Sequence, residues 1–218
     1  MRLLGRRPAD DAQSRIELRN SPRFSLVMRT AKLLCESGEY VCIVRDISAT
    51  GTKIRLFHEV PPDEHLYLEL ANGRRYAMER VWQDGDHAGY RFSCVIEINE
   101  FIEETSLYRR RPVRLRLQRP CLVTADGRDW HSLVVNISQQ GACIEASGEL
   151  PVRQLVRVEV PGLPLRFGHI CWRKKHAHGV VFQNALRLDE LARHAFALQP
   201  YPEMPAKPIE GEAAARCA

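Results

Sequence analysis

The sequence lacks the short motifs by which many enzymes and metal proteins are recognised. It contains no G-x-S-x-G elbow, no phosphate-binding loop and no H-E-x-x-H. Its seven cysteines include no C-x-x-C pair and offer no clustered zinc ligands, so we expect buried, reduced thiols. Because no nucleophile and base recur together, we predict that the protein is not an enzyme and holds no metal.

Long apolar runs and a strong charge of one sign are also absent. No stretch approaches the length of a membrane-spanning helix, and the basic first residues lack the apolar core of a signal peptide, so we expect a cytoplasmic protein. The net charge is +5, from 32 basic and 27 acidic residues. This balance permits an anionic partner without requiring one.

What the sequence does contain is one set of residues written twice. DISATG at 46–51 is matched by NISQQG at 136–141, and RNSPR at 19–23 is matched by RRPVR at 110–114. The offset is 90 for the first pair but 91 for the second, and we expect the one-residue change in the loops CESGE and ADGRD. Recurrence in order and in spacing indicates a duplicated domain. The same offset of 90 relates Trp82, Gly89 and Phe92 to Trp172, Gly179 and Phe182.

The apolar pattern of each unit predicts short antiparallel strands followed by a helix. Leu115 and Leu117 in RLRLQR alternate with polar residues, and similar segments are separated by turns rich in Gly, Pro and Asp. Many short strands at regular spacing favour a mainly β barrel or sandwich. At the end of the second unit, LDELARHAFALQ places one apolar stripe on a helix, formed by Leu188, Leu191, Ala192 and Ala195.

The repeat also sets the expected domain boundaries. We predict a first domain over 15–98, a helical linker over 99–108 and a second domain over 109–200. Residues 1–14 and the tail 201–218, which is rich in Pro, Ala and Glu, are expected to be flexible.

Arginine is concentrated in two places that we name the first arginine segment (19–23) and the second arginine segment (109–114). Arg19 and Arg23 are four residues apart, as are Arg110 and Arg114. A guanidinium can hold a phosphate through two parallel hydrogen bonds, stack on a purine or reach the O6 and N7 atoms of guanine. The spacing therefore suits a ligand that carries both phosphate and guanine.

The D/N-x-S-x-x-G sequences supply a second polar group. Asp46 and Ser48 flank Ile47, so strand alternation directs both polar side chains to one face. A carboxylate there can accept from the N–H groups of guanine, whereas an amide offers only its carbonyl oxygen without charge assistance. The same residues could instead form surface salt bridges around a turn. The second copy repeats the arrangement with Asn136, Ile137 and Ser138.

Other repeated or paired residues have simpler interpretations. Gly51 and Gly141 would allow a positive-φ turn or the close approach of a ligand. Trp82 and Trp172 are expected to pack in the barrel, as large aromatic residues usually do. We expect a solvated turn at 176–178, where two histidines lie close together without a third metal ligand.

The R-x-x-x-R segment followed by D/N-x-S-x-x-G resembles the PilZ domain, and both motifs are complete in both units. The resemblance implies two six-stranded antiparallel β-barrels and a bacterial signal-transduction receptor for cyclic di-GMP, with no further cofactor. It implies that each arginine segment is a mobile strap that closes over the ligand. The ligand contacts it implies are Arg19, Arg23, Asp46, Ser48, Gly51, Arg109, Arg110, Arg114, Asn136, Ser138 and Gly141.

Three functions are compatible with these features. The leading hypothesis is a cyclic di-GMP receptor in which ligand binding orders the arginine segments, rearranges the domains and signals to a protein effector. The alternative is an adaptor that acts through protein surfaces without the nucleotide. General nucleic-acid binding is disfavoured by the modest net charge and by the lack of an aromatic-studded basic face.

The residue before R-x-x-x-R differs between the units and predicts a difference in stoichiometry. It is Leu18 in the first unit and Arg109 in the second. By resemblance, an arginine there favours a stacked pair of ligands, because another guanidinium offsets additional phosphate charge. Calorimetric titration of the separate domains is expected to give more cyclic di-GMP per second domain than per first. Equal values would contradict the prediction.

Overall fold

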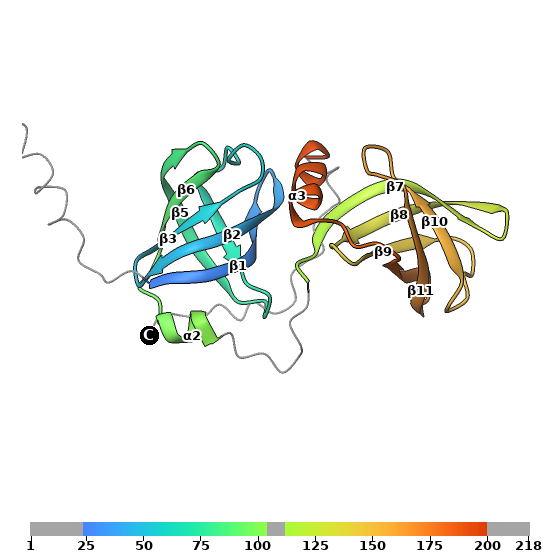
Figure 1. The fold of residues 1–218 in the computed structure, drawn as a ribbon, viewed down its shortest axis with the longest axis horizontal. Coiled ribbons are helices and arrows are strands. Elements are labelled where there is room, and N and C mark those ends of the chain that lie inside the picture. Colours follow the sequence, from blue (N-terminus) through green and yellow to red (C-terminus); the bar gives the residue numbers. More distant parts are fainter. Residues whose placement is uncertain (1–23, 104–111, 200–218) are drawn as a thin grey trace, which may run out of the picture.

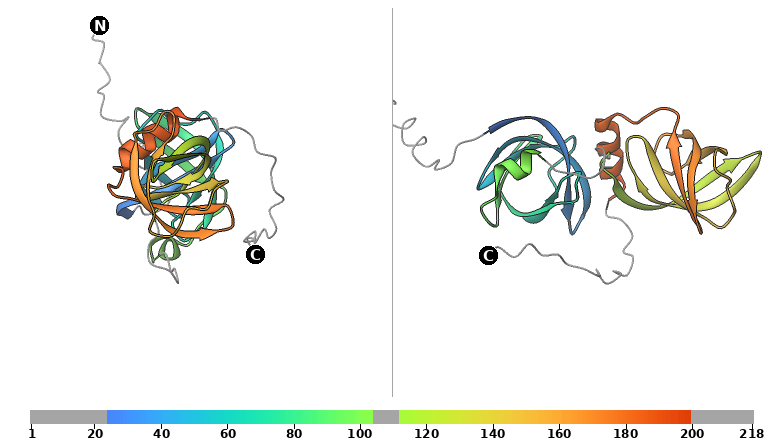
Figure 2. Two further views of the ribbon diagram at one scale, coloured as in Figure 1. Left: turned by 90° about the vertical axis from the view of Figure 1, so that its right-hand side faces the viewer. Right: turned by 90° about the horizontal axis from the view of Figure 1, so that it is seen from below.

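The computed structural model describes residues 24–103 and 112–199, which form two closed antiparallel β-barrels (Figure 1). Each barrel has six strands and is followed by a helix, which confirms the fold expected from the sequence. The two barrels lie side by side along the long axis of the molecule, with the last helix between them (Figure 2). We call them barrel 1 and barrel 2.

Barrel 1 closes in the strand order β1-β2-β3-β6-β5-β4. Helix α2 (Ile98–Glu103) follows it and buries Phe101 in the barrel core. Arg29 donates hydrogen bonds to the carbonyl oxygens of Phe101 and Ile102, which fixes the helix to β1. The strands are β1 (Phe24–Cys35), β2 (Gly38–Ser48), β3 (Gly51–Arg55), β4 (His65–Glu69), β5 (Arg75–Asp84) and β6 (His87–Phe92).

Barrel 2 repeats this topology in the order β10-β11-β12-β9-β8-β7. Its core contains Leu115 and Leu117, which confirms the alternation predicted for RLRLQR. Helix α3 (Leu188–Ala197) buries Leu191, Ala192 and Ala195, as the helical stripe predicted. The strands are β7 (Leu115–Ala125), β8 (Arg128–Ile137), β9 (Gly141–Ala146), β10 (Leu155–Glu159), β11 (Arg166–Lys174) and β12 (Ala177–Phe182).

The one-residue difference between the units lies in a β-bulge, and the loop position expected from the sequence is wrong. Cys35 pairs with Gly38 and Ala125 with Arg128, so the two loops have equal length. The registers of β1 and β7 instead break between Ser25 and Arg29 and between Arg116 and Arg119. A bulge absorbs an extra residue by bending one strand locally. It also interrupts the alternation there, and Met28 is exposed.

Apolar contacts join barrel 2 to barrel 1 through α3. Val41 on β2 is fully buried and belongs to the core cluster of barrel 2. Phe196 on α3 stacks on His58, with ring centroids 4.3 Å apart, and lies 5.9 Å from the ring of Tyr40. Burial lowers the pKa of His58, because the neutral imidazole is favoured in this apolar contact. One helix thus completes the core of barrel 2 and covers a face of barrel 1.

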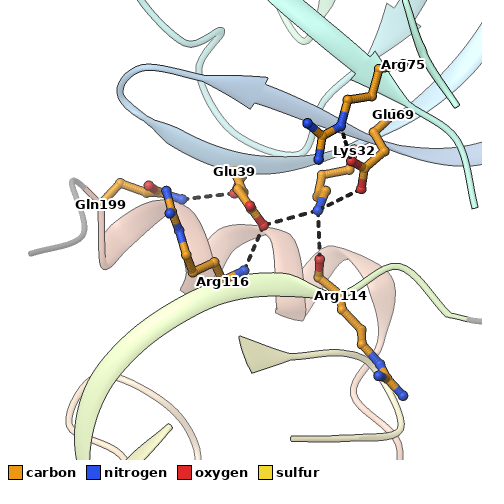
Figure 3. A network of polar contacts seen from close by, with 7 residues as sticks. All are labelled: Lys32, Glu39, Glu69, Arg75, Arg114, Arg116 and Gln199. Carbon is orange, nitrogen blue, oxygen red and sulfur yellow. Dashed lines mark hydrogen bonds and ion pairs between the residues drawn. The ribbon is translucent and has the colours of Figure 1, made fainter. Parts of the chain in front are cut away.

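A polar cluster continues the same interface (Figure 3). Lys32 on β1 contacts Glu39 at 3.3 Å and Glu69 at 2.9 Å, and it donates to the carbonyl oxygen of Arg114 at 3.3 Å. The backbone N–H of Arg116 donates to Glu39 at 2.8 Å. The two barrels are therefore held together at the residues where β7 begins. We call Lys32, Glu39, Glu69 and the backbone of 114–116 the interdomain cluster.

Gly51 at the start of β3 and Gly141 at the start of β9 each lie close to the backbone of a neighbouring strand. Neither glycine has a positive φ, which was one of the two roles expected from the sequence. A Cβ atom on Gly51 would lie 2.5 Å from the carbonyl oxygen of Tyr90, and one on Gly141 would lie 2.1 Å from that of Val180. Only glycine allows the neighbouring strand to approach this closely. Positive φ occurs instead at glycines such as Gly73 and Gly127 in other turns.

None of the helices in the described part of the chain is both long and apolar enough to span a membrane.

Replacing Gly141 with alanine is expected to lower the free energy of unfolding by about 1–3 kcal/mol, because the methyl group would clash with strand β12. Chemical denaturation followed by circular dichroism measures this. Gln140→Ala is the matched control, since Gln140 is exposed and precedes the glycine directly. Equal stability of the two variants would show that the strand can move away at no cost.

Candidate ligand-binding site

The two D/N-x-S-x-x-G sequences form matching turns, each between neighbouring strands. Ser48 Oγ lies 3.2 Å from both the backbone N–H and the carbonyl oxygen of Gly51. Ser138 Oγ donates to the carbonyl oxygen of Gly141 at 3.1 Å. Both serines are buried. The serine of the motif therefore holds the turn together, a role the sequence did not reveal.

The residues before each serine alternate as predicted. Ile47 and Ile137 are buried in the two cores, which leaves Asp46 and Asn136 on the outer side of the barrels. Asp46 and Asn136 are half-buried, and each lies at a break in strand register, between Val44 and Asp46 in β2 and at the matching point in β8. A bulge re-aims the side chain at its end, so both polar groups stand at the barrel surface beside the turn.

Trp82 and Trp172 lie on the outer surface, and their expected position inside the barrel is wrong. Each has 41% of its surface exposed. Each indole covers a glycine on the next strand, because a Cβ atom would come within 2.0 Å of the Trp82 ring at Gly89 and within 2.1 Å of the Trp172 ring at Gly179. This contact explains why a tryptophan and a glycine recur together. It leaves one face of an aromatic ring near each turn.

In barrel 1 the turn and the tryptophan line one hollow of about 220 Å³. Asp46, Gly51 and Trp82 border it together with two cationic residues, Lys53 and Arg91. The Lys53 ammonium lies 5.9 Å from the Trp82 ring centroid, and Arg91 forms a 2.9 Å ion pair with Glu79. Sequence comparison of the units missed both cations, because Cys143 and Val181 occupy their positions in barrel 2. The sequence feature that could have identified Lys53 and Arg91 is their outward-facing position on the predicted strands that became β3 and β6.

In barrel 2, Arg114 at the end of the second arginine segment lies beside the site. Leu115 pairs with Ile137, so Arg114 precedes β7 beside the turn that begins at Asn136. The pKa of the Cys143 thiol is raised by burial and by Glu145, and the nearby charge of Arg114 partly opposes this. Arg114 immediately precedes β7, whose residues 115 and 116 pair with Ile137 and Asn136 of the motif, and Asn136 pairs in turn with Cys143. Figure 3 shows that side chain extending away from barrel 1.

Four of the residues predicted to bind ligand lie outside the described residues: Arg19, Arg23, Arg109 and Arg110. Phe24, where the description of barrel 1 begins, pairs with Ile47. Of the eleven predicted residues, the structure brings together Asp46, Ser48 and Gly51 in barrel 1. In barrel 2 it brings together Arg114, Asn136, Ser138 and Gly141.

The remaining candidate residues have structural roles. His178 is buried rather than solvated, with its ring 2.9 Å from the carbonyl oxygen of His176, and burial lowers its pKa. No group of three potential metal ligands occurs within 24–103 and 112–199. Of the six described cysteines, only Cys42 and Cys121 are buried, whereas Cys94 and Cys171 are exposed.

Several solved structures are similar to the chain. Borreliella burgdorferi PlzA in complex with cyclic di-GMP is 9% identical, with a TM-score of 0.32 and coverage of 86% of this chain and 99% of PlzA. Bacillus subtilis MotI (DgrA), an inhibitor of motility, is 13% identical, with a TM-score of 0.34 and coverage of 79% and 96%. Escherichia coli YcgR in complex with cyclic di-GMP is 13% identical, with a TM-score of 0.30 and coverage of 78% and 83%.

Comparison of the sequence with protein families identifies the family of the chain. No curated protein matches the chain closely enough to count as a relative. The PilZ domain family, however, matches it twice, over residues 17–105 and 108–197. These two matches span most of the 218 residues and coincide with the two barrels. The chain therefore belongs to the PilZ domain family and carries two copies of the domain.

Proposed function

We propose that this protein is a cyclic di-GMP receptor in which each barrel offers one binding site. The observation that carries the proposal is the strand register that sets Arg114, directly before β7, beside the start of the Asn136–Gly141 turn, within a domain of the PilZ family. In the proposed site, Arg114 and the polar side chain of Asn136 act together at one surface of barrel 2, with the Trp172 indole on the same barrel. These are the groups that a phosphate-linked guanine dinucleotide needs.

In the proposed complex the groups act on different parts of the ligand. Guanidinium groups of the arginine segments hold phosphate oxygens through paired hydrogen bonds or stack on the bases. The carboxylate of Asp46, or the amide oxygen of Asn136, accepts from the N–H groups on the pairing edge of guanine. Ser48 and Ser138 keep the turn in shape, since both hydroxyls are bonded within it. The protein acts by binding, and no step of chemistry is assigned to it.

The two sites differ in how their positive charge is supplied. In barrel 1, Lys53 and Arg91 stand on the barrel wall beside the turn. In barrel 2, the corresponding wall residues are uncharged, and the positive charge comes from the second arginine segment. Closure of that segment over a ligand therefore matters more at the second site than at the first.

The second arginine segment also continues into the interdomain cluster. The carbonyl oxygen of Arg114 accepts from Lys32, and the N–H of Arg116 donates to Glu39, so both backbone groups are bonded to barrel 1 (Figure 3). A ligand that draws the Arg114 side chain towards barrel 2 acts on the same residue whose backbone holds barrel 1. We propose that ligand binding at barrel 2 shifts the relative position of the barrels through this residue.

The cluster is suited to a switch between two discrete arrangements. The side chains of Lys32, Glu39 and Glu69 are only 13%, 16% and 17% exposed. Charges enclosed to this extent are costly to leave unpaired, so the contacts form or break together. A ligand shifts such an equilibrium only when it binds one arrangement more tightly. Engagement of Arg114 by the phosphates supplies that difference.

Titration of cyclic di-GMP tests the binding sites directly. Arg114→Ala is expected to weaken binding at the second site by about ten- to a hundredfold, because a hydrogen bond to a charged group contributes about 1.5–3 kcal/mol. Arg23→Ala is expected to do the same at the first site. Isothermal titration calorimetry measures both, with Arg128→Ala as an exposed control on the same barrel. Unchanged affinity in both variants would exclude the proposed sites.

Small-angle X-ray scattering tests the domain movement. Addition of cyclic di-GMP is expected to change the scattering profile of the full chain. Lys32→Met is expected to shift the ligand-free profile in the same direction, because it removes the contact with Arg114. Arg75→Gln is the control. Arg75 also forms an ion pair with Glu69, at 2.7 Å, but its side chain is exposed, and the hydrogen bond to Arg114 comes from Lys32 instead. Scattering that ligand leaves unchanged, although calorimetry shows binding, would reject the movement alone.

A further inference from the structure

Barrel 2 carries an exposed apolar face on strands β10, β11 and β12. Leu155 is 64% exposed, Phe167 51% and Val181 37%. Leu155 pairs with His169, and His169 pairs with Val181, so the three side chains form one row across the strands. Phe167 stands two residues from His169 on the same side of β11. Neighbours in such a row lie about 5 Å apart, which makes the surface continuous. We call Leu155, Phe167, His169 and Val181 the apolar face.

The matching surface of barrel 1 is polar, which shows that the barrel itself does not require apolar residues there. The corresponding row pairs His65 with Glu79 and Glu79 with Arg91, and Ala77 replaces the phenylalanine. Arg91 and Glu79 form an exposed ion pair. Barrel 1 keeps one exposed aromatic residue in this region, Tyr67, where barrel 2 has Arg157. Within one chain, the same frame thus carries an ionic surface in one copy and an apolar surface in the other.

The apolar face is separate from the interdomain contact but adjoins the candidate ligand site. Val181 pairs with Gly141 of the motif turn. The contact between the barrels is made instead by α3 and the start of β7, and Figure 1 shows β10 and β11 on the side of barrel 2 away from α3. Packing between the two barrels therefore leaves this face uncovered. Contiguous exposed apolar surface of this kind marks an interaction site.

Charge identifies the kind of partner that fits. Residues 150–185, which contain the apolar face, include one acidic residue, Glu159, and six basic residues: Arg153, Arg157, Arg166, Arg173, Lys174 and Lys175. The matching residues 60–95 of barrel 1 include four basic residues, Arg74, Arg75, Arg80 and Arg91. They also include six acidic residues, Asp63, Glu64, Glu69, Glu79, Asp84 and Asp86. The stretch of sequence that contains the apolar face is thus strongly basic, whereas the matching stretch of barrel 1 is mildly acidic. Three of these arginines lie next to the face: Arg153 is two residues before Leu155, Arg166 precedes Phe167, and Arg157 pairs with Phe167 and forms a 2.6 Å ion pair with Glu159.

We propose that the apolar face is the docking surface for an acidic segment of a protein partner. Apolar side chains of the segment pack on Leu155, Phe167 and Val181, and its carboxylates pair with arginines at the edge of the face, first among them the exposed Arg153. Two copies of this chain do not fit face to face, because their basic rims would repel each other. A nucleic acid does not fit either, since the face has one aromatic residue among aliphatic ones. The proposal does not rest on nucleotide binding, and the face shares one residue, Val181, with the wall of the candidate ligand site.

The test replaces the apolar face with its counterpart from barrel 1. The triple variant Leu155→His, Phe167→Ala, Val181→Arg introduces the residues found at the matching positions of barrel 1, where the same six-stranded barrel accommodates them. A random peptide library displayed on phage is selected on the wild-type full chain and counter-selected on the triple variant. The enriched peptides are expected to combine apolar with acidic residues. A labelled peptide of this kind is expected to bind the triple variant about tenfold more weakly or worse, as when anchoring side chains are removed, and to lose affinity as salt is added.

Two control variants accompany this test. Tyr67→Arg removes the exposed aromatic residue of barrel 1 and is expected to leave peptide binding unchanged. Phe167→Ala alone is expected to weaken binding even if the triple variant folds poorly, which circular dichroism would reveal. Peptides that lack acidic residues, or that bind wild type and Phe167→Ala equally, would overturn the proposal. So would sedimentation showing that wild type self-associates through this face, or competition by labelled DNA for the same residues.

Discussion

One lysine lies at the centre of the polar contact between the two barrels. Lys32 binds two carboxylates of barrel 1 and the carbonyl oxygen of Arg114, the residue that leads into the first strand of barrel 2. The cluster is largely shielded from water, so its charges depend on one another. The residue that is proposed to hold ligand in barrel 2 is therefore also the residue on which barrel 2 is attached. The proposed ligand contact and the contact between the barrels both involve Arg114. In the proposed mechanism, ligand binding at barrel 2 can therefore change the relative position of the two barrels.

Much of the fold could be predicted from the spacing of apolar residues along the chain, because strands and helices bury side chains at different intervals. Alternation in RLRLQR predicted the buried Leu115 and Leu117, and the stripe of Leu191, Ala192 and Ala195 predicted α3. The turns were predictable because Asp or Asn, Ser and Gly have few other uses in that order. What the sequence could not reveal depends on the neighbouring strand. The bulge in β1, the carbonyl oxygen against Gly51 and the indole over Gly89 arise only when distant segments pair.

The candidate site shows the same division. Comparison of the two units selects residues that both copies keep, so it selected the motif and overlooked Lys53 and Arg91, which only barrel 1 has. It could not find the interdomain cluster either, because Glu39 and Arg116 are partners from different barrels. Duplication preserves what the frame and the common ligand need. The copies differ in the wall of the site and on the outer strands, and these are the places where we propose separate tasks for the two barrels.

The position of α3 also affects how the chain folds. Its Phe196 lies against His58 and Tyr40 of barrel 1, while its Leu191 and Ala195 belong to the core of barrel 2. A chain made from its N-terminus completes barrel 1 well before this helix leaves the ribosome. Until then, Val41 and its neighbours on β2 face water, and the nascent protein presents a sticky surface that the finished one hides. Helix α3 follows the twelve strands of the two barrels in the sequence, so a translation product interrupted before it would leave this surface exposed and would be more prone to aggregate than the intact chain.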